Sequence, residues 1–216
     1  MSHQVTFPSV YAITSGLTTV RTTPESSEFV HILRWVEATV AAEIPLIQIR
    51  EKSLSARVLY ELCVRAAAIT RGSLTRLLVN DRFDIALAAG VDGVHLTTRS
   101  LPANVVRSIC GERFLIGVST HSLQSTQQAQ QEGADFAVFG PVFETPSKQF
   151  FGEPQGLKKL REVTTALQGF PILAIGGIDL DNGADCFRAG ASGIAAIRLF
   201  DQTDLKWTKL TLDQLY

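Results

Sequence analysis

The sequence contains few cysteines and has no excess of charge of either sign. Its three cysteines among 216 residues, Cys63, Cys110 and Cys186, lie far apart, without a CxxC pair or metal-ligand spacing. This pattern excludes a disulfide framework and predicts reduced, buried thiols in a cytoplasmic protein. A formal net charge of −1 provides no long-range attraction to nucleic acid or to an anionic membrane. We therefore expect neither as a partner.

Long hydrophobic runs and dividing segments are also missing. No unbroken run of about 18 apolar residues is present, and the N-terminal MSHQVTFPSV lacks the apolar core of a signal peptide. No linker or low-complexity segment divides the chain. These absences predict one soluble, cytosolic domain over residues 1–216, in which 45% of the residues are hydrophobic and can form a core.

Short β-type runs alternate with helix-type stretches along the whole chain. Repeated strand–helix units with short connections predict parallel strands, and eight units fit a single-domain (β/α)8 TIM barrel of the α/β class. The alternative is an open doubly wound sheet, but only Ser15-Gly16-Leu17 follows the first strand, where a glycine-rich fingerprint would be needed. The expected strands are residues 10–15, 46–51, 76–81, 93–96, 114–120, 136–143, 172–178 and 193–198.

The second expected strand carries polar residues at every second position of LIQIREK (46–52). Period two places Gln48, Arg50 and Lys52 on one face, while Ile47 and Ile49 face the helices. In a barrel the polar face points inward near the mouth, where active sites of this fold lie. Buried charges need partners, so this row predicts an anionic ligand. An internal salt bridge with an acidic residue on a neighbouring strand is the alternative.

The third expected strand ends in Asn80-Asp81. An amide and a carboxylate at the barrel mouth can hold Mg²⁺, which prefers oxygen ligands together with substrate phosphates. Alternatively, Asp81 caps the helix expected at residues 82–89. The C-terminal stretch 205–216 is expected to form the last covering helix.

The fifth expected strand ends in a hydroxyl and an imidazole that share a face, Ser119 and His121. A histidine two residues beyond a serine at the catalytic face is a candidate general acid or base. His95, inside the shorter fourth strand, is expected to fill the barrel as a structural residue.

The loops after the sixth, seventh and eighth strands carry candidate phosphate ligands. In this fold the loops after strands seven and eight frequently bind phosphate through backbone N–H groups, and glycine permits the close approach. After strand six, two hydroxyls and a lysine could grip a phosphate beneath a lid, with a solvated surface loop as the alternative. The candidates are Thr145, Ser147, Lys148, Gly176, Gly177 and Arg198.

These motifs, in this order, resemble the thiamine phosphate synthase and thiazole tautomerase family. The resemblance covers nearly the whole chain. It rests on YAIT (11–14), IQIREK (47–52), VNDRFDIALAAGVDGVHL (79–96), IGVSTH (116–121), GPVFETPSK (140–148), AIGGI (174–178) and AGASGIA (189–195).

The resemblance implies small-molecule substrates and a division of the site. The synthase joins a hydroxymethylpyrimidine diphosphate to a thiazole phosphate and releases pyrophosphate. Residues of this sequence match its diphosphate and Mg²⁺ positions at Gln48, Arg50, Lys52, Asn80, Asp81, Ser119 and Lys148. They match its thiazole contacts at Thr145 and Ser147, and its thiazole-phosphate end at Gly177, Ile197 and Arg198.

Two positions depart from the synthase pattern. Ser100 stands where the synthase has a second Mg²⁺-binding aspartate, beside Arg99, which would repel the cation, and Arg198 replaces the usual serine. The tautomerase, which shifts a proton on a thiazole carboxylate phosphate, lacks the full metal site and uses a histidine at the position of His121. On these grounds we favour the tautomerase, with His121, Lys52 and Lys148 as catalytic residues. The synthase is the alternative, because Gln48, Lys52 and Asp81 match it. Mg²⁺ at Asp81 is the only cofactor implied.

Two other classes of function stay open. A phosphosugar isomerase or epimerase would share the phosphate loops, but it would need a catalytic carboxylate or histidine pair in place of the Gln48, Arg50 and Lys52 row. A non-catalytic regulator would bind thiazole phosphate without turnover. The sequence leaves the oligomeric state open, including a homo-oligomer.

Overall fold

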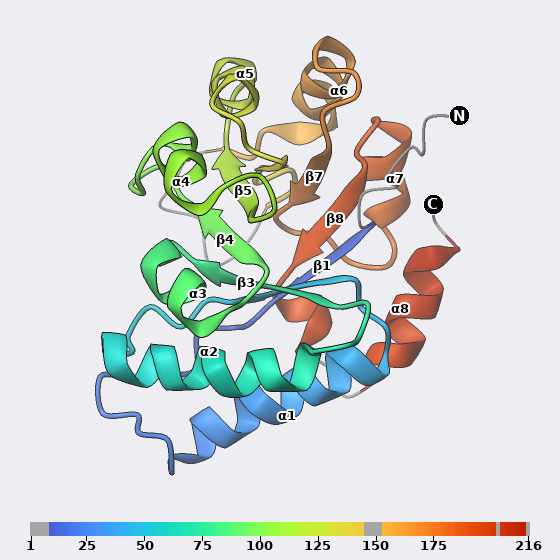
Figure 1. The fold of residues 1–216 in the computed structure, drawn as a ribbon. Helices are drawn as coiled ribbons and strands as arrows, with labels where there is room; N and C mark the ends of the chain where they lie inside the picture. The colour runs from blue at the N-terminus through green and yellow to red at the C-terminus, as the bar shows by residue number, and fades with distance from the viewer. Residues whose placement is uncertain (1–8, 145–152, 202–203, 215–216) are drawn as a thin grey trace.

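The computed structural model describes residues 9–144, 153–201 and 204–214, and its strands form a closed barrel in chain order (Figure 1). All neighbouring strands are parallel, including the closing pair of first and last. The predicted TIM barrel is confirmed, and the open sheet is wrong. The strands are β1 (Val10–Ile13), β2 (Leu46–Ile49), β3 (Arg76–Asn80), β4 (Gly93–Leu96), β5 (Leu115–Thr120), β6 (Phe136–Phe139), β7 (Ile172–Ile175) and β8 (Gly193–Ala196).

Helices surround the barrel and bury their apolar faces against the strands (Figure 1). In the first helix, for example, Phe29, Ile32 and Val36 recur at helical spacing and are buried. A 3₁₀ turn, η2 (Arg198–Phe200), precedes the last helix. The helices are α1 (Ser27–Ala41), α2 (Ala56–Thr70), α3 (Phe83–Ala89), α4 (Ala103–Cys110), α5 (Leu123–Gln131), α6 (Gly156–Ala166), α7 (Gly183–Arg188) and α8 (Leu205–Asp213).

Successive residues of each strand face two different cores. On β2, Leu46 belongs to the cluster inside the barrel, together with Tyr11 of β1. Ile47 and Ile49 belong to the larger cluster between strands and helices. The alternation agrees with the period of two that the sequence indicates.

Most strands end earlier than the sequence predicts. Strand β6 stops at Phe139 rather than at residue 143, and β8 stops at Ala196 before the turn of η2. The residues beyond still bond to neighbours, since Val142 N donates to Ile175 O at 2.8 Å, and Val142 is buried. A buried apolar loop therefore resembles a strand in sequence. As a consequence, Arg50, Lys52 and Arg198 lie on the loops that follow strands.

At the end of the barrel where the strands begin, side chains connect neighbouring strands. The residue that precedes each of β4, β6 and β8 accepts a hydrogen bond from a backbone N–H of the strand before. These bonds join Asp92 to Leu77 (2.8 Å), Asp135 to Ile116 (2.7 Å) and Ser192 to Ile172 (3.4 Å).

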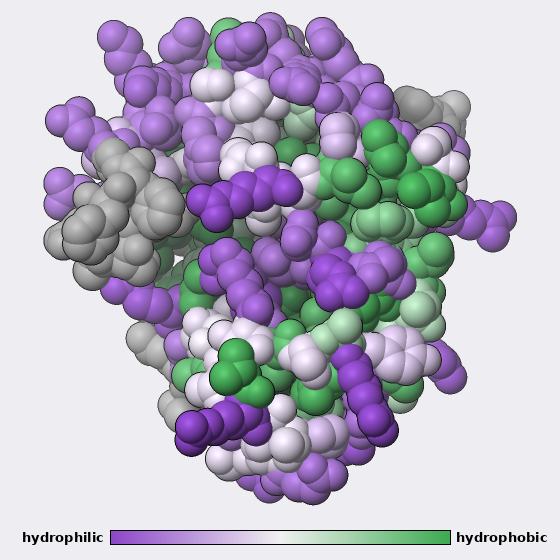
Figure 2. Space-filling model, turned by 90° about the vertical axis from the view of Figure 1, so that its left-hand side faces the viewer, coloured by the Kyte–Doolittle hydropathy of each residue, from purple (hydrophilic) through white to green (hydrophobic). Residues whose placement is uncertain are grey.

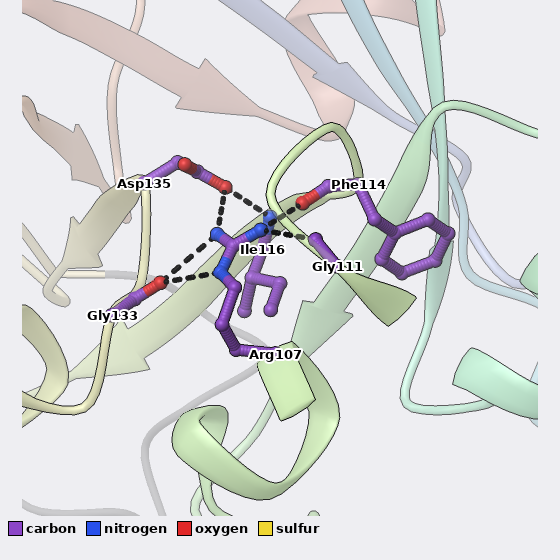
Figure 3. A network of polar contacts seen from close by, with 6 residues as sticks. All are labelled: Arg107, Gly111, Phe114, Ile116, Gly133 and Asp135. Carbon is purple, nitrogen blue, oxygen red and sulfur yellow. Dashed lines mark hydrogen bonds and ion pairs between the residues drawn. The ribbon is translucent and has the colours of Figure 1, made fainter. Parts of the chain in front are cut away.

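Arg107 of α4 extends the Asp135 connection into a network (Figure 3). Its guanidinium pairs with the Asp135 carboxylate at 2.7 Å and donates to the backbone oxygens of Gly111, Gly133 and Phe114 at 2.7–3.2 Å. Only 12% of the Arg107 side chain is exposed. The network ties α4 and the start of β5 to the residues before β6, so we assign it to stability.

None of the three cysteines forms a disulfide. Cys63 and Cys186 are buried, and burial raises the pKa of each thiol to about 12. Cys110 is only partly buried, which differs from the prediction of buried thiols, because it ends α4 near the surface. Among the described residues, no helix is both long enough and apolar enough to cross a membrane.

Candidate active site

The loops that follow the strands gather at one face, which Figure 2 views from the side at which α1 and α2 begin. Hydrophilic residues, drawn in purple, cover the middle of this face (Figure 2). A cavity of about 300 Å³ opens between the loops after β2, β3 and β4. Its polar lining comes from Glu51, Lys52, Asn80, Asp81, Arg82, Thr97 and Arg99.

Gln48 points into the barrel, as its place in the polar row predicts. Its side chain is 1% exposed, and Nε2 donates to the Tyr11 hydroxyl at 3.0 Å. Burial raises the pKa of Tyr11 well above its ordinary value, so this hydroxyl stays protonated. Tyr11 thus holds the Gln48 amide at the inner end of the site. The sequence analysis did not identify Tyr11 as a residue of the site.

Arg50 and Lys52 continue the row beyond the strand, and neither charge forms an ion pair with a carboxylate of the described residues. The internal salt-bridge alternative therefore finds no support there. Burial lowers the pKa of Arg50 despite the nearby Glu51 carboxylate. The pKa of Lys52 is lowered by burial and then by the positive charges of Arg50 and Arg99. The row is therefore suited to binding an anion.

Glu51, between these two cations, is a structural residue of the site that the period-two pattern concealed. It is 3% exposed, and it accepts bonds from the backbone N–H groups of Gly16 and Thr18 at 3.2 and 3.1 Å. The Thr18 hydroxyl donates a third bond at 2.8 Å. Glu51 thus ties the loop after β1 to the loop after β2. The available signal was the loop after the first strand, because the backbone N–H groups of a loop have no strand partner and need another acceptor.

Asp81 turns toward the loop after β4. Its backbone has a φ of 64°, in the left-handed region, and its N–H donates to His95 O at 2.8 Å. The Ser100 hydroxyl donates a hydrogen bond to the Asp81 carboxylate. Asp81 does not cap α3, because the residue at the N-cap is Arg82 and no side chain caps that terminus. The capping alternative is therefore wrong.

The oxygen donors around Asp81 allow a test of the expected Mg²⁺. Asn80 and Asp81 line the cavity, but no group of three or more His, Cys, Asp and Glu among the described residues could hold a metal ion. Mg²⁺ is commonly bound by one or two carboxylates, with water and substrate phosphates as the other ligands. The donor set therefore fits Mg²⁺ that binds together with a diphosphate, through Asp81.

The side chains of Ser119 and His121 contact different parts of the molecule. Ser119 Oγ lies 2.9 Å from Nε2 of His95, which is buried inside the barrel as predicted. His121 is exposed, its Nδ1 is bonded to Gly140 O, and it does not line the cavity. The shared face that the sequence indicates does not bring His121 to the cavity, because β5 ends at Thr120 and the chain turns there.

The glycines after β7 are required by close packing. Gly176 and Gly177 have φ values of 103° and 66°. A Cβ on Gly176 would lie 2.6 Å from Pro141, and one on Gly177 would lie 2.5 Å from Glu144 O. This proximity joins the loops after β6 and β7.

The remaining candidate residues differ in their exposure, and three of them fall outside the described residues. Ile197 is half-buried against the cluster inside the barrel, and Arg198 is exposed at the start of η2. Thr145, Ser147 and Lys148 lie outside the described residues. The phosphate-binding role of all these residues stays a prediction.

Comparison with protein families decides the relationship. The family model of thiamine monophosphate synthase matches residues 20–200. The chain belongs to this family. A putative thiamine-phosphate synthase of Geobacter sulfurreducens is 45% identical over 77% of this chain and 78% of its own. A thiamine-phosphate synthase of Roseiflexus castenholzii is 38% identical over 91% of this chain and 84% of its own.

A solved structure agrees. The thiamine phosphate pyrophosphorylase from Pyrococcus furiosus superposes with a TM-score of 0.78 and 30% identity, covering 96% of this chain and 95% of that one. The chain is thus an enzyme of thiamine biosynthesis. Because these relatives carry synthase names, the comparisons favour the synthase alternative over the tautomerase that the sequence analysis preferred.

Proposed function

We propose that the protein is a thiamine-phosphate synthase that joins hydroxymethylpyrimidine diphosphate to thiazole phosphate and releases pyrophosphate. The observation that carries this proposal is the cavity in which Lys52 and Arg99 face Asp81, with no ion pair to either cation among the described residues. Such a site suits a multiply charged leaving group. A proton shift alone would not need this concentration of positive charge.

The reaction breaks the bond between the pyrimidine methylene carbon and the diphosphate oxygen. The bonding electrons leave with pyrophosphate, and the resulting carbocation is attacked by the thiazole nitrogen, which forms the new C–N bond. Arg50 and Lys52 would neutralise the departing anion, and Gln48, held by Tyr11, would present its amide to the diphosphate. When bound, Mg²⁺ would neutralise further charge on the diphosphate, with Asp81 and Asn80 as the residues that would hold it.

The tautomerase is less well supported by the geometry. Its expected acid–base residue, His121, is exposed and bonded to Gly140 O, and it does not line the cavity. General acid–base catalysis requires the group to reach the proton that it transfers, directly or through one water.

Two parallel assays on the purified protein test the proposal. We expect thiamine phosphate to form from the two substrates with Mg²⁺ present, and no aromatisation of the thiazole tautomer above the uncatalysed rate. Lys52→Gln should lower turnover by about a hundredfold, as expected for loss of a group that stabilises the leaving anion. Tautomer conversion without condensation would establish the isomerase. Tight binding of thiazole phosphate without either reaction would establish the non-catalytic regulator.

A further inference from the structure

The turn from Thr97 to Ser100 places Arg99 at the rim of the cavity. Thr97 N donates to Ser100 Oγ at 2.8 Å, and Ser100 N donates back to Thr97 O at 3.1 Å. Arg99 N bonds to Thr97 Oγ1 at 3.3 Å. Because both ends of the turn are hydrogen-bonded, the backbone of Arg99 has a defined position, and Arg99 lines the cavity together with Lys52.

The cations at this end of the site are not neutralised in the described part of the chain. Arg99, Arg50 and Lys52 form no ion pair there. Arg82, which lines the same cavity, differs, because its guanidinium is held by both carboxylate oxygens of Asp84 at 2.8 and 2.6 Å. In the described part of the chain, these three cations therefore outnumber the two carboxylates that act on them, Glu51 and Asp81.

These charges lie close enough to act on one another. After burial, the positive charges of Arg50 and Arg99 are the main causes that lower the pKa of Lys52, and the Asp81 carboxylate opposes them. Like charges that are brought together and partly removed from water repel one another. A multivalent anion that binds among them relieves this repulsion.

The carboxylate that would hold a metal is already engaged. The Ser100 hydroxyl donates a hydrogen bond to the Asp81 carboxylate and adds no negative charge beside it. A divalent cation approaching Asp81 must displace this hydrogen bond and meets the repulsion of Lys52 and Arg99. The same residues therefore favour the diphosphate over a metal ion that arrives without it.

We propose that Arg99, Arg50 and Lys52 form a clamp that binds a diphosphate group without a divalent cation, so that Mg²⁺ adds little to this binding. The inference deepens the proposed function, on which it rests for the identity of the diphosphate substrate. Cations from two separate loops suit two linked phosphoryl groups better than a single phosphate.

Calorimetry with inorganic pyrophosphate tests the clamp. We expect binding in excess EDTA, an affinity increase of less than about threefold with Mg²⁺, and weaker binding of orthophosphate. Arg99→Gln should weaken pyrophosphate binding in EDTA by about tenfold or more, since it removes a charge-assisted contact. Arg113→Gln is the matched control, because Arg113 is exposed before β5 at the far end of the barrel, and its affinity should equal that of the wild type.

Ser100→Asp tests the opposite condition, in which a second carboxylate beside Asp81 favours the metal. The new carboxylate beside Asp81 should weaken binding in EDTA and raise the effect of Mg²⁺ to tenfold or more. Wild-type binding that requires Mg²⁺, or an Arg99→Gln affinity equal to that of the wild type, overturns the clamp. Thiamine phosphate formation is measured on the same samples. Pyrophosphate binding in EDTA without thiamine phosphate formation would refute only the proposed function. Thiamine phosphate formation together with strictly Mg²⁺-dependent pyrophosphate binding would refute only the clamp.

Discussion

The imidazole Nε2 of His95 lies 2.9 Å from the hydroxyl oxygen of Ser119 inside the barrel. The other ring nitrogen, Nδ1, is buried and has no hydrogen-bond partner among the residues that the structure describes. The ring also packs near Tyr11 and Phe136, with centroids 5.8 and 6.1 Å away. A proton on both nitrogens would leave a charge in an apolar environment, so the histidine must stay neutral. Burial, followed by the positive charge of Arg50, lowers the pKa of His95 to about 3.

This histidine should make stability depend on pH. In the unfolded chain it takes up a proton near pH 6.5, whereas in the folded chain it does so only near pH 3. The contribution to stability is therefore complete above pH 6.5 and is lost as the pH falls toward 3, at no more than about 1.4 kcal/mol per pH unit. Urea unfolding at pH 7, 6 and 5 measures it. His95→Gln should remove this share of the slope, and an equal slope in both proteins would contradict the prediction.

Glu51 should stabilise the loop after β1 through its three acceptor bonds. We expect Glu51→Ala to lower the free energy of unfolding by about 3 kcal/mol, because the buried N–H and hydroxyl of Thr18 and the N–H of Gly16 lose a charged acceptor. Thr18→Val removes only the hydroxyl bond and should cost about 1 kcal/mol. A double-mutant cycle measured by urea unfolding checks the pair, and additive losses would show that the two side chains do not interact.

Arg107 should contribute to stability without affecting the chemistry. Arg107→Met removes the guanidinium donor from three backbone carbonyls and from the Asp135 carboxylate, which keeps its bond from Ile116 N (Figure 3). We therefore expect a loss of about 3 kcal/mol in unfolding free energy. Turnover at 20 °C should be unchanged, because the network lies at the end of the barrel away from the cavity. Arg113→Met, at an exposed position, should change stability by less than about 0.5 kcal/mol. Impaired turnover in folded Arg107→Met would disprove the separation of the two ends.

The alternation of apolar runs predicts the barrel well, because each strand must place residues toward two cores. The same rule places Gln48 inside the barrel, whereas Arg50 and Lys52 follow on the loop after β2, which ends at Ile49. It overextends strand β6, where Val142 is buried like a strand residue although the ladder has ended at Phe139. Burial and hydrogen-bond register are separate properties, and sequence periodicity reports only the first.

Contacts between separate loops explain what the sequence could not predict. The hydrogen bonds from Thr18 to Glu51 and from Ser100 to Asp81 join residues 33 and 19 positions apart, and neither spacing has a periodic signature. Likewise, His121 follows Ser119 by two residues, but the turn after Thr120 separates them. A shared face holds only while the strand continues.

Gly177 offers a test of the other end of the site. Gly177→Ala places a methyl group 2.5 Å from Glu144 O and 2.7 Å from Phe143 Cβ, at a φ of 66°. Gly169→Ala is the matched control, since its φ is 86° but no atom of the described residues lies within 4 Å of the added carbon. We expect the control to lose about 1 kcal/mol from the left-handed backbone alone. Gly177→Ala should lose about 3 kcal/mol, because the clash is added.

Gly177→Ala also tests whether the thiazole phosphate and the diphosphate are bound by different loops. If the loop after β7 holds the thiazole phosphate through backbone N–H groups, its displacement should raise the KM for thiazole phosphate by about tenfold. Pyrophosphate binding should stay within about twofold of the wild type, because the clamp of Arg50, Lys52 and Arg99 lies on the loops after β2 and β4. Steady-state kinetics and calorimetry measure the two effects. An equal loss of both would mean that the variant disturbs the barrel as a whole, and an unchanged KM would place the thiazole phosphate elsewhere.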